Sequence, residues 1–231
     1  MTAGADEKLD FKPDFGGKPK IAGVRPKDAS TMILIDRSTG TPRVLLGRRA
    51  SAHVFMPDIY VFPGGRRDPR DHALPFRGDL NPVVTEKLCA GVPASVGVKR
   101  ARALALAAIR ELHEETGILP GADGAPADLS TLRYVARAIT PPGMTRRFDT
   151  RFFATFVDEA NLDMGRLGDS SELEDVRWLD ISDQTAVKMH HITLRVLEDL
   201  QTLLKADPSL PFGSPVPFYF TRNGQFVRSR L

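Results

Sequence analysis

The sequence is poor in cysteine, with Cys89 as its only one among 231 residues. A single cysteine cannot form an intrachain disulfide, so an oxidising compartment would offer this chain no covalent stabilisation. We interpret Cys89 as a small buried hydrophobic side chain, because no nearby histidine or basic cluster would activate its thiol. This cysteine usage favours a cytoplasmic protein.

Long apolar runs are also missing. No stretch approaches the roughly 20 apolar residues that a membrane-spanning helix needs, and residues 1–30 lack the apolar segment of a signal peptide. With 42% hydrophobic residues the chain can still bury a substantial core, and its length suits one domain with elaborations. The sequence therefore predicts a soluble protein with one catalytic domain and no membrane partner.

Charge of one sign is not concentrated in any segment. The 32 Lys and Arg residues are scattered among 29 Asp and Glu residues, and the formal net charge is +3. The lack of long basic runs argues against a dedicated nucleic-acid binder. A mildly positive surface would favour the approach of small phosphorylated anions, an effect that salt weakens.

Short β-prone runs alternate with two helical stretches, which predicts the α/β class with a mixed sheet. Strands are expected at 32–35, 44–46, 59–62, 132–139, 150–157 and 176–179. Helices are expected over 99–116 and 189–203, and a short one over 83–88. Asn223-Gly224 predicts a C-terminal hairpin between 218–221 and 225–227.

The same reading divides the chain into three parts. Residues 1–29 are rich in glycine, proline and charge and are expected to form a flexible arm. Residues 30–205 are expected to form the catalytic domain, and residues 206–231 a C-terminal extension that contains the hairpin.

Three glutamates at the end of the first long helix carry the chemistry. Glu111, Glu114 and Glu115 stand at positions i, i+3 and i+4, so a helix projects their carboxylates from one face. They repel one another and oppose the negative end of the helix dipole, which is unfavourable without a cation. Carboxylate oxygens suit Mg²⁺ or Mn²⁺, which can neutralise a diphosphate and activate water. The alternative is a solvated, glutamate-rich helix end.

The segment from Arg110 to Ile118 resembles the second half of the Nudix box, G-x5-E-x7-R-E-U-x-E-E-x-G-U, where U is a bulky aliphatic residue. All the specified positions match, including Gly117. The first half also resembles the family, because Phe62-Pro63-Gly64-Gly65 is the usual lead-in and Asp71 stands where the box has Glu. Residues 72–109 then separate Asp71 from Arg110, where the family pattern has seven, so we interpret 72–99 as an insertion that splits the box.

An insertion at this place resembles the Nudix enzymes related to peroxisomal coenzyme A diphosphatases. Leu45-Leu46-Gly47-Arg48-Arg49-Ala50, at matching distance from the lead-in, is similar to the coenzyme A signature LLTxR(S/A)x3Rx3Gx3FPGG, although Val54 and Asp58 replace its later Arg and Gly. The resemblance implies a Nudix-type α/β/α sandwich and Mg²⁺-dependent hydrolysis of a nucleoside diphosphate derivative such as coenzyme A or an acyl-CoA. ADP-ribose, NADH and dinucleoside polyphosphates are alternative substrates, and a non-catalytic nucleotide sensor is an alternative of another class.

The resemblance also implies roles for individual residues. Glu111, Glu114 and Glu115 would be the metal ligands, and Arg110 would brace their carboxylates. Gly64 and Gly65 would let the loop backbone pack against the helix, Asp71 would replace the loop glutamate, and Gly117 would end the helix.

Weaker candidates lie outside the box. Glu172 and Glu174 precede a predicted strand and are candidates for a general base or a further metal ligand, with an exposed acidic loop as the alternative. The candidate substrate-binding residues are Arg49, Arg146, Arg147 and Phe148. A structural basic loop is the alternative for the two later arginines.

Two expectations concern the remaining features. His190 and His191 are neighbours, and neighbouring histidines on a helix point apart, so at least one is expected to face solvent. The insertion 72–99 is expected to shape the substrate entrance, as a lid or as the contact of a homodimer, because it leaves and re-enters the box at the metal site.

Overall fold

The computed structural model describes residues 6–9, 23–50, 58–90, 94–121 and 125–231. Its helices are α1 (Pro82–Cys89), α2 (Ala94–Thr116) and α3 (His191–Ala206), with a short 3-10 helix, η1 (Pro69–Ala73). Its strands are β1 (Glu7–Lys8), β2 (Lys27–Asp36), β3 (Arg43–Arg49), β4 (Tyr60–Val61), β5 (Gly64–Arg66), β6 (Phe76–Arg77), β7 (Ala127–Asp128), β8 (Arg133–Ile139), β9 (Phe148–Phe156), β10 (Leu173–Asp180), β11 (Pro217–Arg222) and β12 (Gln225–Arg230). Each strand and helix predicted from the sequence overlaps one of these elements, with differences at the ends.

Among the described residues, ten strands form one mixed sheet in the order β1-β12-β11-β8-β9-β2-β3-β10, with β4 on β3 and β5 on β2. The central strand β2 pairs in parallel with β9 along one edge. Its other edge is shared, because residues 29–31 pair with β5 and residues 35–36 pair with β3. The sheet therefore divides beside β2, and the cavity described below lies at this division.

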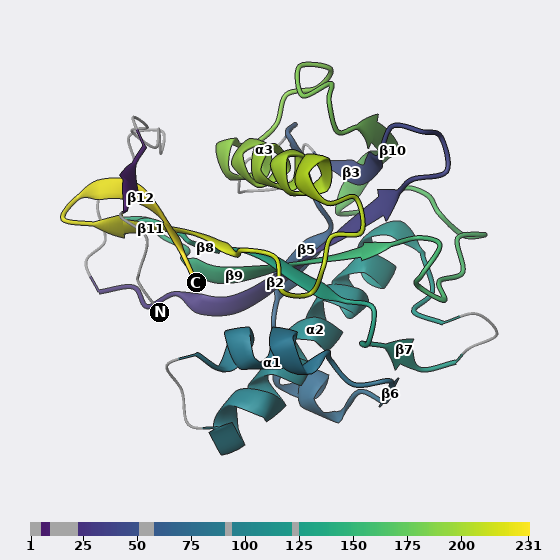
Figure 1. Ribbon diagram of the computed structural model, residues 1–231, viewed down its shortest axis with the longest axis horizontal. Coiled ribbons are helices and arrows are strands. Elements are labelled where there is room, and N and C mark those ends of the chain that lie inside the picture. The colour runs from purple at the N-terminus through teal and green to yellow at the C-terminus, as the bar shows by residue number, and fades with distance from the viewer. Residues whose placement is uncertain (1–5, 10–22, 51–57, 91–93, 122–124) are drawn as a thin grey trace.

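Helices cover both faces of the sheet (Figure 1). Successive side chains of a strand point to opposite faces, so β2 feeds two cores. Met32 and Leu34 pack with residues of α1 and α2, whereas Ile33 and Ile35 pack with residues of α3. The α/β/α sandwich predicted from the resemblance is confirmed.

Helix α2 holds the three glutamates and is longer than the sequence suggested, because it begins at Ala94 rather than near 99. Its stretch from Ala103 to Ile109 is buried, as the continuous apolar run indicated. The helix ends at Thr116, and Gly117 follows with φ +76° while its N–H donates to His113 O at 2.9 Å. A left-handed glycine at this position is a common helix stop.

Residues 72–99, the predicted insertion, include α1 and the first turns of α2. Leu80 and Val84 are buried in the core cluster that contains the apolar face of α2. Residues 94–99 are the first turns of α2, which places residue 99, the end of the predicted insertion, about 18 Å along the helix from Glu111 at 1.5 Å per residue. The expectation that both ends of the insertion meet at the metal site is wrong, because the insertion extends the catalytic helix backwards.

The ends of the described chain join the sheet. β1 pairs with β12, and β2 begins at Lys27, inside the segment expected to be an arm. Residues 1–5 and 10–22 of that arm lie outside the described residues. β11 and β12 form the predicted hairpin, with Asn223 and Gly224 both at positive φ, and β11 also pairs in parallel with β8. The segment after residue 206 thus contributes two strands to the sheet rather than an appendage.

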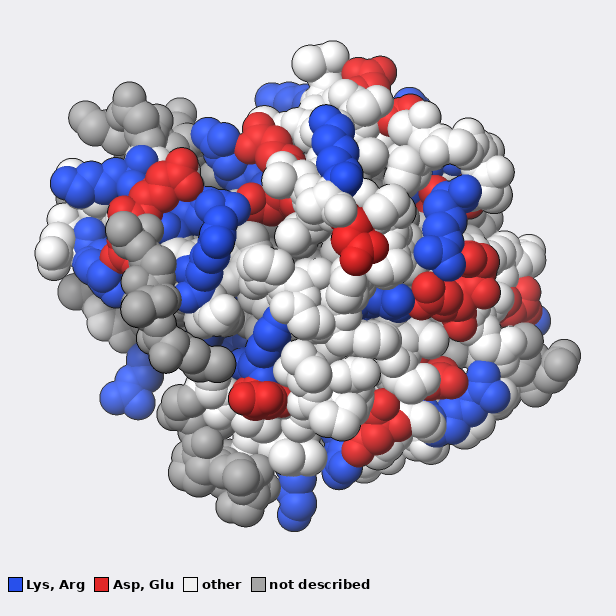
Figure 2. Space-filling model, in the orientation of Figure 1, with Lys and Arg blue, Asp and Glu red and all other residues white. Residues whose placement is uncertain are grey.

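The surface carries mixed charge. On the face in Figure 2, acidic and basic side chains are interspersed over most of the molecule, with more basic ones around β12. There Arg222 and Arg228 pair with Asp6 and Glu7. Across the described ranges, no helix is long and apolar enough to cross a membrane.

Candidate active site

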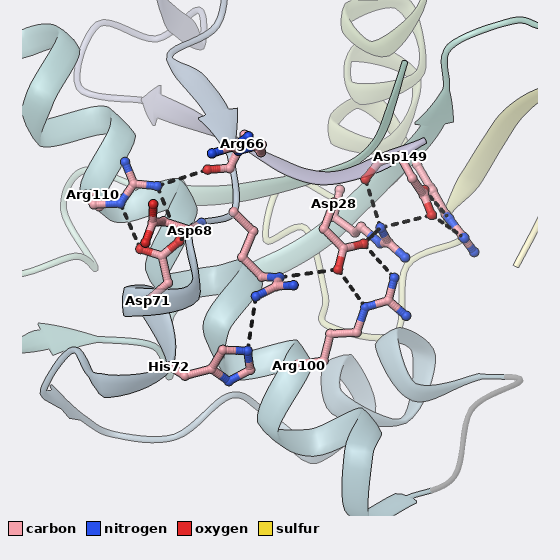
Figure 3. A network of polar contacts seen from close by, with 11 residues as sticks. Asp28, Arg66, Asp68, Asp71, His72, Arg100, Arg110 and Asp149 are labelled. Atoms are coloured by element: carbon pink, nitrogen blue, oxygen red, sulfur yellow. Dashed lines mark hydrogen bonds and ion pairs between the residues drawn. The ribbon is translucent and has the colours of Figure 1, made fainter. Parts of the chain in front are cut away.

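Arg110 organises the carboxylates at the end of α2. Its Nε donates to Asp71 Oδ1 at 2.7 Å, and its Nη1 donates to Glu111 Oε1 and Glu114 Oε2, both at 2.8 Å. Its Nη2 donates to the carbonyl oxygen of Arg66 at 3.1 Å, so the guanidinium also holds the end of β5 (Figure 3). One cation thus joins three carboxylates that come from two distant parts of the sequence.

Asp71 is the buried partner in this arrangement, with a fully buried side chain. It stands in η1 and also accepts from the backbone N–H of Asp68 at 2.6 Å. Although burial alone would lower the pKa of Arg110, its hydrogen bond to Asp71 and the charge of Glu111 raise that pKa above its ordinary value. Asp71, which the resemblance puts at the position of the loop glutamate, therefore lies beside the carboxylates of α2.

Gly64 and Gly65 bring the backbone of β5 against α2. Glu115 Oε2 accepts from the backbone N–H of Gly64 at 2.7 Å. A Cβ on Gly65 would lie 2.4 Å from Glu111 Cδ, and one on Gly64 would lie 2.6 Å from Ser30 O. Neither glycine has positive φ, so glycine is needed here for close approach rather than for an unusual backbone conformation.

Burial perturbs two of the glutamates. Glu115 is 6% exposed, and desolvation raises its pKa to about 8 against the opposing effect of the Gly64 N–H. Desolvation also raises the pKa of Glu111, while the charge of Arg110 opposes the rise. A carboxylate that is desolvated beside another carboxylate holds its proton more tightly, and a nearby cation would reverse the shift.

The glutamates face a cavity of about 460 Å³. Its lining includes side chains from β2, β5, β8 and β9, the N-terminal residues of α3, and Glu111, Glu114 and Glu115 of α2. The four strands are neighbours in the order β5-β2-β9-β8, which spans roughly 14 Å at about 4.8 Å per strand. The described part of the insertion contributes no lining residue, so the expectation that it shapes the entrance is wrong.

Several predicted site residues meet in this cavity. Arg49, Arg146, Phe148 and Glu172 all line it. Burial lowers the pKa of Arg49, while the charges of Glu115 and Glu172 oppose the fall, which places these three groups close together. Arg49 and Glu172 are more than a hundred residues apart in the sequence, and the pairing of Arg49 with Leu173 across β3 and β10 brings them into proximity.

Two other candidates point elsewhere. Glu174 accepts from Arg48 Nη2 at 2.8 Å and does not line the cavity. Arg147 donates to the backbone oxygens of Thr140 at 3.0 Å and Val24 at 2.8 Å, so it fixes the loop before β9. For Arg147 the contacts therefore favour the structural alternative.

The sequence did not mark the two histidines as residues of the cavity. His190 and His191 both line the cavity, with ring centroids 4.0 Å apart. Burial lowers the pKa of His190 to about 3 and that of His191 to about 4. The expectation that one would face solvent is wrong, because His190 is the N-cap of α3 rather than a helical residue. The β8 side chains Ala138 and Ile139 were also not foreseen, since nothing in their sequence marks them.

The chemistry of the three glutamates fits a divalent cation. Oxygen donors suit Mg²⁺ and Mn²⁺, and the single guanidinium of Arg110 leaves Asp71, Glu111 and Glu114 with an excess of negative charge. Within the described ranges, no three acidic, histidine or cysteine side chains are already gathered around one point. Glu111 and Glu114 are turned to Arg110 and Glu115 to Gly64, and a bound ion would compete for these oxygens.

Comparison with known proteins agrees with this arrangement. Residues 97–200 match the family model described as NUDIX domain, a range that includes Arg110–Ile118 but not Phe62–Asp71. The NUDIX hydrolase from Alicyclobacillus acidocaldarius superimposes with a TM-score of 0.58 at 26% identity, over 81% of this chain and 94% of that chain. The search of the curated proteins found no match.

Other solved structures resemble the chain more weakly. The NUDIX domain of Shewanella oneidensis NrtR, in complex with ADP ribose, has a TM-score of 0.48 at 15% identity, over 84% of this chain and 94% of that one. MutT NUDIX hydrolase from Burkholderia pseudomallei has a TM-score of 0.46 at 17% identity, over 77% and 99%. The chain therefore has the Nudix fold, and its residues 97–200 match the NUDIX domain model.

Proposed function

We propose that this protein hydrolyses a diphosphate linkage in a nucleoside diphosphate derivative, with Mg²⁺ or Mn²⁺ held by Glu111, Glu114 and Glu115. The observation that carries the proposal is the end of α2, where Glu111 and Glu114 share the single guanidinium of Arg110 and Glu115 accepts from the Gly64 N–H, all three at one side of a cavity of about 460 Å³. Bound there, a divalent cation would neutralise the diphosphate and activate water for attack on phosphorus.

We further propose that Phe62–Asp71 and Arg110–Ile118 are two halves of one Nudix box, split by residues 72–99. The ion pair between Asp71 and Arg110 supports this, since it joins the halves across 39 positions of sequence. The close approach of Gly65 to Glu111 supports it as well, because even a methyl group on Gly65 would collide with the carboxylate.

Glu172 is our candidate for the general base. It lines the cavity and lies near enough to Glu115 and Arg49 to affect the pKa of both. Glu174, the other candidate in the sequence, is paired with Arg48 outside the cavity lining. Arg49 is placed to neutralise a phosphate oxygen beside these carboxylates.

The shape of the cavity favours a substrate with a diphosphate and a ring system. From the glutamates the lining crosses β5 and β2 to Phe148, the first residue of β9, and to Arg146 just before it. An aromatic face and a guanidinium at that end of the cavity suit a base or a sugar phosphate. We propose a coenzyme A-type molecule as the first choice, on the residues from Leu45 to Gly65, with ADP-ribose, NADH or a dinucleoside polyphosphate as the alternatives.

A nucleotide sensor without catalysis is the competing function. Such a sensor would bind nucleotide in the same cavity but would bind metal weakly, because Glu111 and Glu114 are paired with Arg110. The complete set of carboxylates favours the enzyme. A small-molecule partner, a cytoplasmic location and a homodimer remain part of the proposal on sequence grounds.

One experiment separates these functions. The protein is incubated with coenzyme A, ADP-ribose, NADH and a dinucleoside polyphosphate, each with Mg²⁺, Mn²⁺ or EDTA, and the product masses are determined. The proposal requires two phosphorylated products from at least one substrate with metal and none with EDTA. Binding of a substrate without any product would favour the sensor.

A further inference from the structure

Strand β10 contains a β-bulge next to the cavity. Leu173 and Glu174 pair with Arg49 and Arg48, and the ladder then resumes at Arg177 opposite Leu46, so β10 has one extra residue. Asp175 lies in this bulge with φ 49°, a left-handed conformation that is uncommon for a residue with a side chain. Non-glycine residues in this region often mark functional segments.

The bulge changes which face of the sheet is occupied by the side chains that precede it. Leu179 packs on the α3 side, and counting back in twos from it would put Leu173 on the same side. Instead the Leu173 side chain lies against Gly47, where an added Cβ would be 2.9 Å from Leu173 Cβ. Gly47 follows Leu45 on the α2 side by the same alternation, so the bulge carries Leu173 to the face where Glu115 lies.

A bulge leaves backbone N–H groups without a partner in the strand ladder. Here the Asp169 carboxylate accepts hydrogen bonds from them. Asp169 Oδ1 accepts from Val176 N–H at 2.9 Å, and the carboxylate also accepts from the backbone of Asp175. These two hydrogen bonds, with that of Val176 the stronger, hold the pKa of Asp169 below its ordinary value. The carboxylate therefore links the loop before β10 to the interior of the strand.

Between Asp169 and the strand lies Glu172, whose backbone is held in place. Ser170 Oγ accepts from the N–H groups of Glu172 and Leu173 at 3.2 and 3.1 Å, and Ser170 N–H donates to Leu173 O at 2.8 Å. Glu172 O accepts from Ala50 N–H at 3.1 Å, next to the cavity residue Arg49. Glu172 itself is exposed, so its position depends on this backbone frame rather than on packing.

We propose that Asp169 is a positioning residue, which fixes the loop 169–173 on the bulge of β10 and thereby aims Glu172 into the cavity. The inference rests on the proposed role of Glu172 as general base. Asp169 does not touch the cavity, so it would act only through Glu172. The alternative is that Asp169 caps the strand for stability alone.

The test uses Asp169→Ala, with Asp180→Ala as the matched control. Asp180 caps the other end of β10, where its Oδ1 accepts from Ser182 N–H at 2.8 Å, away from the cavity. We expect Asp169→Ala to lower kcat roughly 10- to 100-fold with little change in KM, since a displacement of about 1 Å has effects of that order. Asp169→Asn keeps an acceptor oxygen and should restore most of the rate, and Asp180→Ala should leave kcat unchanged.

The decisive readout is the combination with Glu172→Gln. If Asp169 acts through Glu172, Asp169→Ala should cause no further loss of kcat in the Glu172→Gln background. Equal losses in both backgrounds, or an Asp169→Ala variant as active as Asp180→Ala, would overturn the inference. A fully active Glu172→Gln would overturn the base assignment together with this inference, whereas the carboxylate site is tested separately by Glu115→Gln.

Discussion

Two networks of arginines and carboxylates lie on the α2 side of the sheet, and they differ in which charge is in excess. Figure 3 shows part of each, with Asp71 beside Arg110 and Asp28 beside Arg100. In the first, the single guanidinium of Arg110 is shared by Asp71, Glu111 and Glu114. Three negative groups around one positive group leave an excess of negative charge. This excess lies at the lining of the cavity.

The second network is centred on Asp28 of β2. Asp28 accepts from Arg100 Nε at 2.9 Å, from Arg151 Nη1 at 3.0 Å and from Arg67 Nε at 3.3 Å. Arg151 continues the network to Asp149. Burial alone would raise the pKa of Asp28, but the hydrogen bond from Arg100 and the charges of the arginines lower it to about 2.

The same side-chain types serve different purposes in the two networks, according to the ratio of arginines to carboxylates. Around Asp28 the arginines outnumber the carboxylates, so the negative charges are fully compensated and the network ties β2 to α2. Around Arg110 compensation is incomplete, which leaves oxygen atoms for a metal ion. We therefore expect substitutions in the first network to affect catalysis and those in the second to affect stability.

The largest effect is expected for Glu115→Gln. The variant keeps the shape of the side chain but removes a ligand charge, and a metal ion supplies several kcal/mol of transition-state stabilisation, or roughly 10³- to 10⁵-fold in rate. Turnover of the best substrate at limiting Mg²⁺ is the measurement, with Glu114→Gln as a second variant. Glu198→Gln, an exposed glutamate on α3, is the control. Near-normal activity of both Glu114→Gln and Glu115→Gln would remove the metal assignment.

Arg110→Ala is expected to have the second-largest effect, a loss of stability as well as activity. It leaves the fully buried Asp71 without its guanidinium, and breaking a buried pair in this way costs roughly 3–5 kcal/mol. Urea unfolding measures the loss. Adding Asp71→Asn to Arg110→Ala should recover part of it, because the neutral amide is cheaper to bury. If the double variant is less stable than Arg110→Ala, the buried charge of Asp71 is not the cause.

Asp28→Asn should destabilise by roughly 1–3 kcal/mol, as for loss of charged hydrogen bonds, and leave kcat unchanged. The folded pKa of Asp28, about 2, is below its ordinary 3.8, so its contribution to stability is present above pH 3.8 and is lost as the pH falls towards 2. Unfolding free energies between pH 5 and pH 2 should therefore converge for the variant and the wild type. A constant difference across this range, or a large loss of kcat, would contradict the separation of the two networks.

The smallest effect is expected at His190, beside the cavity but outside both networks. Its folded pKa of about 3 lies below the ordinary 6.5, so the unfolded chain binds more protons and stability falls as the pH drops below 6.5. We expect His190→Gln to lose less stability than the wild type between pH 7 and pH 5 in thermal unfolding. Parallel pH dependence of the two proteins would show that His190 does not titrate with this shift.

Much of the fold was predictable, because local patterns determine it. The β-prone run 32–35 indicated the central strand, Asn223-Gly224 indicated the hairpin, and Gly117 indicated the end of the catalytic helix. The course of the insertion was not predictable. Its first helix was recognised, but its continuation into α2 depends on the packing of Leu80 and Val84 under that helix.

The candidate site was likewise predictable only in part. The spacing of Glu111, Glu114 and Glu115 was sufficient to place three carboxylates on one helix face, because the helical period is a property of the backbone. The resemblance to a known motif added Asp71 as a partner, but the sequence alone could not choose between Glu172 and Glu174. That choice follows from tertiary contacts, because Glu172 lines the cavity whereas Glu174 is paired with Arg48.

The sequence by itself determined the elements, the class of fold and the cluster of carboxylates, since each depends on residues within a few turns or strand positions of one another. Only the tertiary structure decided that Arg49, Glu172 and His190 meet at one cavity and that Arg147 and Glu174 are engaged outside it. Strand pairing across more than a hundred residues sets these neighbours. Register and side-chain competition for partners are properties of the folded chain, and no local pattern encodes them.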